Sequence, residues 1–582
     1  MDLNLKKWQE KWGLVGDLFS PVEVGEIKEK LKRLEIRNVV YCSFESRFAK
    51  SGGLAAVTTR ILPYLNELEG VERAILITPL YPHIIDRKKL EKTGIQFKVA
   101  FDQKAIKVDI YRYIHHYEQP GPGHLEEYYI KARGFFEARN RLNDPYIYHQ
   151  DAWLNNITLL ENALFFCKAV PCALEALGIR SDILFHLQEW QTSLIALTAK
   201  EALIDGTLDS CGCVQTMHNP YDCFVSASSL AKIVSPKRIG NIEKNPLFAQ
   251  NNGLTAYQIG LQLTDGPVTT VSENFARELT TDIIHTQHFA PHLQEILKQC
   301  GIVGIKNGLF VNLPPEFSQH EKLTIEEIKT IKQEKRKALL HLLDQYRPSG
   351  RFGQLTYRSQ SITHLPENIP IVVMSGRLDP VQKGYDILLR AIQRFAEDDI
   401  KVVLTPMPVR DSDLDYFREA AEGCRGNVTV FPIRLEKGYQ ELQMGSTFGL
   451  MPSIYEPFGA AVEYMVNGTV TISRATGGLK DQIDDRCGLL YREASTHYQL
   501  QHIKEFAASA DRVQARQDNN WVKDMADALN RKLQEATYLY RDRPEEYYQM
   551  ILEGFQKART FDWQASTHKY FRVYQQVKAR SL

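Results

Sequence analysis

The hydrophobic positions of this chain form short continuous runs that alternate with longer stretches of helical periodicity, and this alternation occurs twice. In the first half, the run at 38–42 leads through a glycine-containing loop to residues 54–65, whose apolar positions fall on one helical face. Short strands that alternate with amphipathic helices are typical of parallel sheets covered by helices. Further strands of the first sheet are predicted at 74–78, 182–187, 214–217 and 268–271, with a helical stretch at 191–203.

The same pattern restarts in the second half. An apolar run at 369–375 precedes a helix over 387–395, and strands follow at 401–405 and 427–431. The predicted fold class is therefore α/β, with two doubly wound, Rossmann-like domains. Ligands of such sheets bind outside the carboxyl ends of the strands, so we expect the two domains to face a central cleft.

The length of 582 residues exceeds what one hydrophobic core usually organises. Residues 324–343 form a charged helical stretch, and residues 346–365 are polar and lack periodicity, which indicates a connection between domains. We expect an N-terminal helical extension at 1–36, an N-terminal Rossmann-like domain at 37–330, a linker and hinge at 331–367, a C-terminal Rossmann-like domain at 368–560, and a closing helix at 561–582 that packs back on the N-terminal domain.

Composition excludes several classes of protein. Lys plus Arg and Asp plus Glu both number 71, so no field covers the whole molecule to attract nucleic acid or anionic lipid. No window approaches the roughly eighteen apolar residues of a membrane span, and the charged start does not read as a signal peptide. The nine cysteines are scattered and odd in number, which is not a disulfide framework. We therefore expect a cytoplasmic protein without nucleic-acid or membrane partners.

Three clusters could suggest a metal, and each has a simpler interpretation. Cys211 and Cys213 are separated by one residue and read as small strand residues. The histidines of 115–124 flank a Pro-Gly-Pro-Gly surface turn, and the aspartates of 411–415 are interpreted as a helix cap. The sequence therefore predicts no metal site.

Residues that could carry chemistry follow the predicted strands. Gly52 and Gly53 precede a helix whose N-terminal N–H groups could bind an anion, although a tight turn alone would also explain them. Arg377 and Lys383 follow the strand that ends near residue 375, and two cations there suit a diphosphate. Glu456 and a second Gly-Gly pair, in 476–479, follow later strands. Each position alone could be structural, but together they favour an anion site.

Six segments, in order, resemble the glycogen and starch synthase family of retaining glycosyltransferases: KSGGL, TMHN, TTVSENFARELT, IKNGL, SGRLDPVQKGYDILLRAI and YEPFGAAVEYMVNGTVTISRATGGLKDQI. Some spacings are similar to archaeal-type members. The resemblance runs from about residue 38 to the end, and it is weak over 80–143 and 318–367. It implies a GT-B fold in which the N-terminal domain takes the acceptor side and the C-terminal domain binds a nucleotide sugar.

The resemblance also implies roles for individual residues. Arg377 and Lys383 match the pair that holds the donor phosphates, and Glu456 matches the glutamate that stabilises positive charge on the transferred sugar. His218 matches a histidine near the reacting carbon. The implied site comprises catalytic Glu456, His218, Arg377 and Lys383; donor-binding Lys50, Gly52, Gly53, Asn307, Tyr464, Thr476, Gly477 and Gly478; acceptor-side or sugar-side Glu45, Glu189 and Trp190; and no metal.

The implied reaction moves glucose from ADP-glucose or UDP-glucose to the non-reducing end of an α-1,4-glucan, with no cofactor. Front-face attack is favoured over a covalent intermediate, because no second carboxylate stands out as a nucleophile. Two alternative functions stay open: a related GT-B transferase that makes a disaccharide or a lipid-linked or protein-linked glycan, and a non-catalytic glucan-binding homologue. The protein could also form a homo-oligomer. Departures from the family pattern at Ala56, Gln188, Gln191 and Phe310 leave the sugar and the acceptor open. The base also stays open, because base contacts are mostly backbone and stacking interactions that leave little trace in a sequence.

Overall fold

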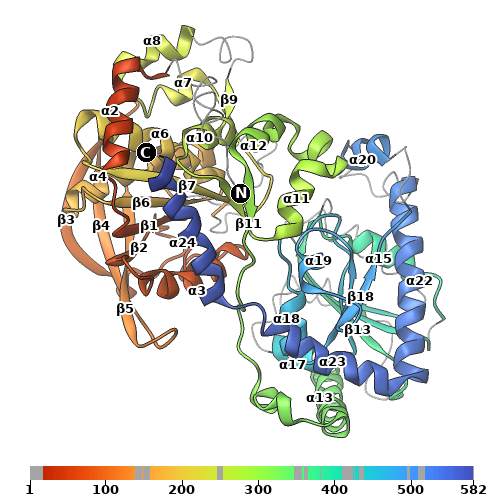
Figure 1. Cartoon of the computed structure of the whole chain (residues 1–582). Coiled ribbons are helices and arrows are strands. Elements are labelled where there is room, and N and C mark those ends of the chain that lie inside the picture. The colour runs from red at the N-terminus through yellow and green to blue at the C-terminus, as the bar shows by residue number, and fades with distance from the viewer. Residues whose placement is uncertain are drawn as a thin grey trace. The chain divides into compact units, whose positions relative to one another are not determined.

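The computed structural model consists of two compact units, coloured by chain position in Figure 1. The first unit comprises Met1–Val271, Leu279–Gly308 and Trp563–Leu582, and the second comprises Ser272–Glu278 and Leu309–Asp562. The chain thus changes unit near 308 and 562, whereas the sequence placed domain limits at 330 and 560. The structure describes residues 18–137, 147–148, 157–244, 253–346, 357–358, 365–379, 382–396, 398–408, 424, 427–430, 438–494, 499–508 and 518–580.

The first unit is built on a nine-stranded sheet in the order β11-β10-β7-β6-β1-β2-β5-β4-β3. The strands from β11 to β5 run parallel, and β4 and β3 extend the sheet as antiparallel neighbours. The predicted strands are confirmed, but the antiparallel extension was not foreseen. The strands are β1 (Asn38–Cys42), β2 (Arg73–Pro79), β3 (Glu91–Phe101), β4 (Lys104–Tyr117), β5 (Gly123–Ala132), β6 (Ile183–Gln188), β7 (Cys211–Met217), β10 (Val268–Thr270) and β11 (Ile302–Gly304).

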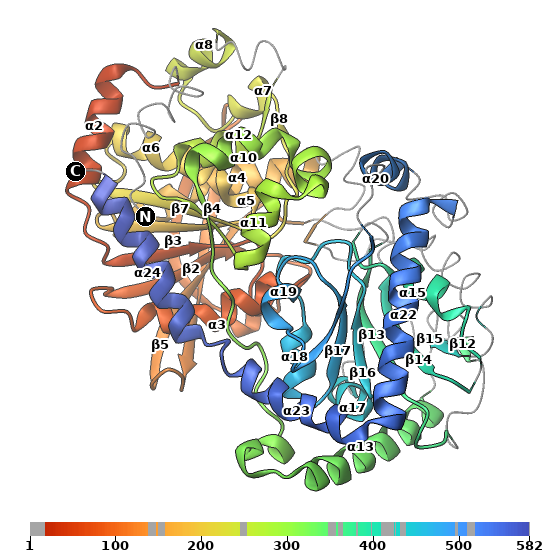
Figure 2. The ribbon, with the colours of Figure 1, turned by 45° about the vertical axis from the view of Figure 1, so that its right-hand side comes forward.

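Helices cover both faces of this sheet, which explains why β1, β6 and β7 are buried along their whole length. On one side α3 packs on β1, β2 and β5, and α24 packs on α3 and β7 (Figure 2). On the other side α4 packs on β3 and α6, and α6 packs on β7. The helices are α3 (Leu54–Asn66), α4 (Ile157–Ala176), α5 (Trp190–Ser193), α6 (Ile195–Asp205), α10 (Ala256–Leu263) and α24 (Trp563–Arg580).

The predicted N-terminal extension contains one described helix, α2 (Pro21–Lys32). Ser20 caps it, and the Ser20 and Glu23 side chains form a capping box. The buried Arg238 of α8 (Pro236–Lys244) donates to the Leu18 carbonyl oxygen and to Glu23. These charge-assisted bonds fasten the extension to the first unit. Residues 1–17 lie outside the described part of the chain.

The closing helix α24 packs within the first unit. The Tyr574 hydroxyl lies 2.8 Å from His186 Nδ1 on β6, and the Thr216 hydroxyl lies 2.7 Å from the other ring nitrogen. Burial lowers the pKa of His186 to about 3, so the ring is neutral. At the start of the helix, Trp563 fills the space beside Gly308.

The second unit is built on a seven-stranded sheet in the order β12-β15-β14-β13-β16-β17-β18, parallel except for β12. The predicted strands are again confirmed, and β13 continues past residue 375 to include Arg377. The strands are β12 (Tyr357–Arg358), β13 (Ile371–Leu378), β14 (Lys401–Pro408), β15 (Val428–Val430), β16 (Phe448–Met451), β17 (Val470–Arg474) and β18 (Gly488–Tyr491).

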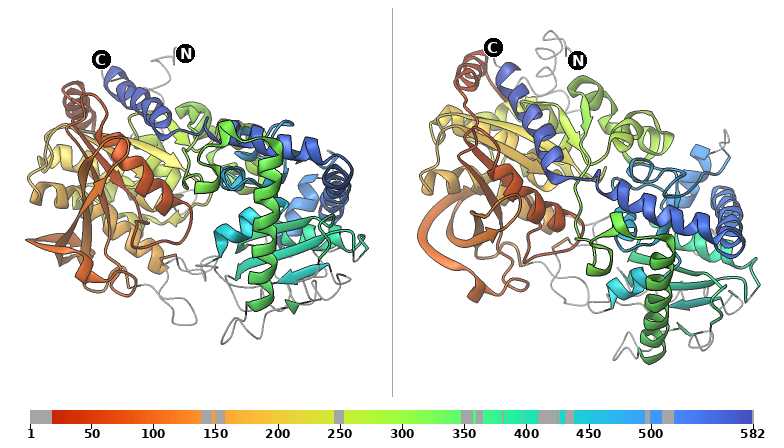
Figure 3. Two further views of the ribbon diagram at one scale, coloured as in Figure 1. Left: turned by 90° about the horizontal axis from the view of Figure 1, so that it is seen from below. Right: turned by 60° about the horizontal axis from the view of Figure 1, so that its bottom comes forward.

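The long helix α13 (Ile325–Gln345), green in Figure 3, packs on α17 and α23 of the second unit. Residues 331–345 of the predicted linker are therefore helical, and 347–356 and 359–364 lie outside the described residues, as do 411–415. Pairs of helices, α15 with α22 and α18 with α23, also pack together. The helices are α15 (Tyr385–Ile392), α17 (Tyr439–Gly445), α18 (Ala461–Val466), α19 (Leu479–Gln482), α22 (Asn520–Asp542) and α23 (Pro544–Ala558).

Within the described ranges, no group of three His, Cys, Asp or Glu side chains is placed to hold a metal ion. Cys211 and Cys213 are buried residues of β7, as predicted. The described helices include none with the length and apolar character that a membrane crossing requires.

The fit of Trp563 against Gly308 gives a testable prediction. A Cβ at residue 308 would lie 2.6 Å from the Trp563 backbone nitrogen, which cannot move aside without shifting α24. Gly308→Ala should therefore lower the free energy of unfolding by about 1–3 kcal/mol. Gly240→Ala in α8 is the control, since nothing lies within 4 Å of its Cβ position; helix propensity should make it neutral or stabilising by up to about 1 kcal/mol. Denaturant titration of both variants would measure these changes. If Gly308→Ala were as stable as wild type, the close packing of Trp563 against Gly308 would be contradicted.

Candidate active site

The turn after β13 carries the two cations predicted to hold a diphosphate. Arg377 lies near the end of β13 and Lys383 lies just before α15, while residues 380–381 of this turn are outside the described ranges. Gln382 connects the turn to its surroundings: its Oε1 lies 3.4 Å from Arg377 Nη2, and its carbonyl oxygen accepts a 2.8 Å hydrogen bond from Ile454 N. The turn is thus joined to the loop that follows β16.

Glu456 lies in that loop and is only 5% exposed. Its Oε2 accepts hydrogen bonds from Lys383 Nζ at 2.7 Å and from the Ser453 hydroxyl at 2.9 Å. Its carbonyl oxygen accepts a 2.9 Å bond from Gly478 N. A buried carboxylate is costly unless it is paired and hydrogen-bonded, and Lys383 supplies that pairing.

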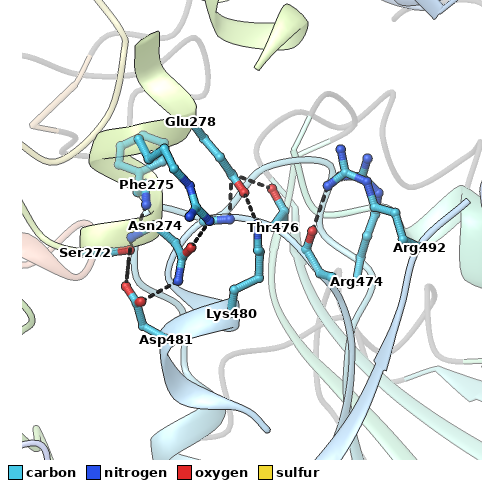
Figure 4. A network of polar contacts seen from close by, with 12 residues as sticks. Ser272, Asn274, Phe275, Glu278, Arg474, Thr476, Lys480, Asp481 and Arg492 are labelled. Atoms are coloured by element: carbon cyan, nitrogen blue, oxygen red, sulfur yellow. Dashed lines mark hydrogen bonds and ion pairs between the residues drawn. The ribbon is translucent and has the colours of Figure 1, made fainter. Parts of the chain in front are cut away.

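The second Gly-Gly turn, Thr476–Gly478, lies between β17 and α19. Its N–H groups are already occupied by the chain itself, because Glu278 Oε2 accepts from Gly477 N at 2.6 Å and from the Thr476 hydroxyl at 3.2 Å (Figure 4). Lys480 Nζ donates to the other Glu278 oxygen at 3.2 Å. A carboxylate of the protein therefore sits where sequence reasoning placed an external anion.

The first Gly-Gly turn, in the first unit, shows the same arrangement. Glu45 Oε2 accepts hydrogen bonds from the backbone nitrogens of Ser51, Gly52 and Ala55, at 3.0, 2.8 and 3.3 Å. Its Oε1 accepts a 3.0 Å bond from the Tyr148 hydroxyl. The N-terminus of α3 is thus satisfied by Glu45, which the sequence placed on the acceptor side, and Gly53 has open space around its Cβ position.

Glu189 has an unusual backbone conformation at the end of β6. Its φ of 61° and ψ of 172° fall in a region that side chains rarely adopt, and such strain concentrates at functional sites. The carboxylate is buried and accepts from the Tyr257 hydroxyl at 3.1 Å and from Asn219 Nδ2 at 3.5 Å. Burial raises the pKa of Glu189 to about 8, helped by the charge of Glu45 and opposed by these hydrogen bonds. Glu189 therefore carries a proton at neutral pH.

His218 lies just after β7 and is held by a residue that departs from the family pattern. Its Nε2 lies 2.8 Å from Gln188 Oε1. Burial lowers the pKa of His218 to about 3, so the ring is neutral, and an amide oxygen as acceptor places the proton on Nε2. His218 Nδ1 then presents a lone pair. Gln188 Nε2 is buried and has no partner among the described residues.

The remaining predicted residues have varied surroundings. Trp190 is buried at the start of α5, and Lys50 is exposed. Asn307 is buried, and its Oδ1 has no partner within the described part of the chain. The ring of Tyr464 fills the space over Gly449.

The departures from the family pattern separate by unit. In the first unit, Ala56 is half-buried in α3, and Gln191 is buried next to Trp190 in α5. In the second unit, the ring of Phe310 meets Phe458 edge to face, with ring centres 5.8 Å apart.

Three residues that support this site were not singled out from the sequence. Ser453 and Gln382 are polar residues in or beside the motifs at strand ends. Their position at strand ends could have identified them as site residues from the sequence. Glu278 bonds to Gly477 across 199 residues of sequence, so no local pattern could reveal the contact. In the second unit, Glu456 beside Lys383 and Arg377 places a carboxylate and two cations at neighbouring strand ends, which can stabilise opposite charges that develop as a bond breaks.

Comparisons with known proteins identify related families, relatives and structures. The family described as starch synthase catalytic domain matches residues 38–299, and the family described as glycosyl transferases group 1 matches residues 358–523. A glycogen synthase from Pseudothermotoga lettingae is 25% identical over 537 residues, covering 88% of this chain and 98% of the relative. A glycogen synthase from Thermotoga maritima is 26% identical over 523 residues, covering 85% of this chain and 95% of the relative.

A solved structure, the catalytic domain of starch synthase IV from Arabidopsis thaliana bound to ADP and acarbose, matches with a TM-score of 0.67 and 20% identity. The match covers 94% of this chain and 99% of that chain. At this identity it shows the fold, which is GT-B. The predicted fold class is thereby confirmed.

The raised pKa of Glu189 predicts a pH-dependent stability difference. The pKa of a glutamate in an unfolded chain is about 4.3, and burial raises the pKa of Glu189 in the folded protein to about 8. Between these pH values Glu189 is protonated in the folded state and ionised in the unfolded state. Stability from this residue therefore falls as pH rises through that window. Glu189→Gln should raise the Tm relative to wild type by an amount that grows from pH 5 to pH 8.5.

Thermal unfolding across this range would measure the effect, with the exposed Glu69→Gln as the control for losing one negative charge. A Glu189→Gln difference that does not change with pH would contradict the buried, protonated state of Glu189.

Proposed function

Because this chain belongs to the glycogen and starch synthase family of glycosyltransferases, we propose that it moves glucose from a nucleotide-diphosphate glucose to the non-reducing end of an α-1,4-glucan, with retention of configuration. The observation that carries the proposal is the contact of Glu456 with Lys383 beside Arg377 in the second unit. A carboxylate and two cations are the groups that a breaking sugar–phosphate bond needs, which supports the proposal. The relatives named glycogen synthase support the choice of glucose and glucan.

The bond that breaks joins the anomeric carbon to a phosphate oxygen. Negative charge grows on the departing nucleotide diphosphate, and in this proposal Arg377 and Lys383 stabilise it, with Arg377 supplying a planar fork for two phosphate oxygens. Positive charge grows on the sugar ring, and Glu456 stabilises it. Two fixed cations can balance the leaving group, so the proposal calls for no cofactor and no metal.

The contacts of Glu456 favour front-face attack over a covalent glycosyl intermediate. Its Oε2 already accepts from Lys383 and Ser453, which lowers its nucleophilicity. In the proposed step, the acceptor hydroxyl attacks the anomeric carbon from the side of the leaving phosphate. The phosphate oxygen takes the proton of that hydroxyl, so no protein base is required.

The first unit supplies sugar-side and acceptor-side groups in this proposal. His218 offers a neutral ring whose Nδ1 lone pair can accept a hydrogen bond from a sugar hydroxyl. Glu189 offers a protonated carboxyl, and Trp190 and Glu45 stay on the acceptor side. Since the Gly52 N–H already donates to Glu45, Lys50 is the residue of this turn that contacts the nucleotide sugar in this proposal.

A cytoplasmic location is part of the proposal, supported by nine free cysteines. The base of the donor is open among adenine, uracil and guanine, with ADP-glucose and UDP-glucose as the donors that the family resemblance implies. Purified protein incubated with ADP-glucose, UDP-glucose or a GDP-sugar, with and without glycogen, would test the function by the nucleotide released and the chain length formed. Glucan elongation with one donor is the expected result. No release of nucleotide from any donor, with or without glycogen, would leave the non-catalytic alternative and overturn the proposal.

Removal of either cation should slow turnover strongly. Arg377→Ala and Lys383→Ala should each lower kcat by roughly 10²–10³-fold, about 3–4 kcal/mol, as for the loss of one preorganised charge-stabilising group. Arg377→Lys should also be slow, because an ammonium cannot reproduce the fork of the guanidinium. Steady-state kinetics at saturating donor would measure this. Arg486→Ala, at an exposed position of the same unit, is the control. Wild-type kcat in either variant would remove that residue from the leaving-group role.

Substitutions of Glu456 separate charge from shape. Glu456→Gln keeps the size and much of the hydrogen bonding but loses the carboxylate that faces the developing sugar cation, so it should be nearly as slow as Glu456→Ala. Initial rates per folded molecule would show this, with the exposed Glu441→Gln as a charge control. If Glu456→Gln kept most of the activity, Glu456 would position a hydroxyl group instead of stabilising charge.

A further inference from the structure

The Thr476–Gly478 turn fits directly against the backbone of Glu456. Gly478 N donates to the Glu456 carbonyl oxygen at 2.9 Å. Gly477 has a φ of +46°, and a Cβ on it would lie 2.0 Å from that same oxygen. A Cβ on Gly478 would lie 2.5 Å from the backbone of Phe458. The glycines of this turn are therefore explained by its closeness to the Glu456 loop, and the turn sets where the Glu456 backbone lies.

The other side of the turn is held by one buried carboxylate. Glu278 is 5% exposed and belongs to α11 (Glu273–Thr281). It accepts bonds from Gly477 N and from the Thr476 hydroxyl, and Lys480 Nζ pairs with its second oxygen. Arg492 Nη1 donates to the carbonyl oxygen of Ala475 on the flank of the turn (Figure 4). Bonds of backbone N–H groups to a carboxylate are among the stronger ones in proteins.

We propose that Glu278 is a positioning residue for Glu456, acting through the Thr476–Gly478 turn, and the proposal rests on the function proposed above. Glu278 fixes Gly477, the turn fixes the Glu456 backbone by its Gly478 N–H and its close packing, and the Glu456 carboxylate is thereby held where it meets Lys383. A catalytic group must be held to within a fraction of an ångström, so loosening of its support lowers kcat.

The same interface contains a second carboxylate that serves as a matched control. Asp481 of α19 accepts from the Ser272 hydroxyl at 2.6 Å and from Asn274 N at 3.1 Å. These bonds fasten α11 to α19 as the Glu278 bonds do, but among the described residues the Asp481 carboxylate bonds to Ser272 and Asn274 and not to the Thr476–Gly478 turn (Figure 4). A variant of Asp481 weakens the contact between α11 and α19 without removing a bond to the turn. It therefore distinguishes a weaker contact between these helices from a loss of support for Glu456.

The experiment compares Glu278→Ala, Glu278→Gln and Asp481→Asn with wild type in three measurements. These are kcat and KM for the donor, the Kd for the nucleotide diphosphate by calorimetry, and hydrogen exchange of peptides that cover 453–459 and 476–480. Glu278→Ala should lower kcat by about 10–100-fold, leave the Kd within about twofold, and speed exchange in both peptides. Glu278→Gln keeps an acceptor for Gly477 N but loses the ion pair with Lys480, so its effects should have the same direction and be smaller. Asp481→Asn should change kcat and exchange at 453–459 by less than about twofold.

Two results would overturn the proposal. If kcat and exchange at 453–459 stay at the wild-type level in Glu278→Ala, the turn does not need Glu278 to hold Glu456. If the nucleotide diphosphate instead binds more tightly while exchange is unchanged, the turn is an anion site and Glu278 is its internal competitor. Should Glu278→Ala not fold, Glu278→Gln alone decides by the same measurements. Wild-type protein that turns over no donor would refute the proposed function, whereas the exchange comparison would still test the positioning role.

Discussion

The burial of Glu456 is the constraint from which the arrangement of the second unit follows. A carboxylate that is 5% exposed needs a cation and hydrogen-bond donors, and the structure supplies Lys383 and the Ser453 hydroxyl. The Lys383 turn is in turn joined to the Glu456 loop by Gln382, and the Gly477–Gly478 turn closes on the same loop from another strand. The ends of β13, β16 and β17 are therefore coupled at the Glu456 loop, through the Glu456 side chain and through backbone contacts.

Both Gly-Gly turns of this protein show that an N-terminal helix turn can be satisfied from within. Glu45 comes from the loop just before its turn and Glu278 from the distant helix α11, and each places a carboxylate on backbone N–H groups of the turn. Local negative charge at these turns makes them poor sites for a free phosphate and good supports for a neighbouring loop. Arg377 and Lys383 are therefore better suited than either turn to meet a diphosphate.

The fold was accessible from sequence because its central strands are buried on both faces and give continuous apolar runs. Arg377, Lys383 and Glu456 were found for a related reason, since strand ends are where a doubly wound sheet places its chemistry. The antiparallel β3–β5 extension was missed because it replaces a crossover helix by a hairpin in a stretch of mixed polarity. The bonds of Glu278 were missed because they join residues that are 199 positions apart in sequence and approach only after the chain has folded. The bonds of Glu45 are local, but residue order alone does not show that its carboxylate turns back onto the start of α3. The strained φ of Glu189 likewise has no signature in residue order.

The path of the chain determines how this protein can be divided. Ser272–Glu278 belongs to the second unit although the first unit supplies the residues on either side, and Trp563–Leu582 returns to the first unit at the end. A fragment that starts at residue 309 would lack Glu278 and leave the Gly477 N–H buried without its acceptor. A fragment that stops at residue 308 would lack Tyr574, which bonds His186, and would uncover the face of β7. Neither fragment would therefore contain all the residues of one unit. To divide this enzyme or exchange its units with those of a relative, the chain would have to be cut at several positions and not only near residue 308.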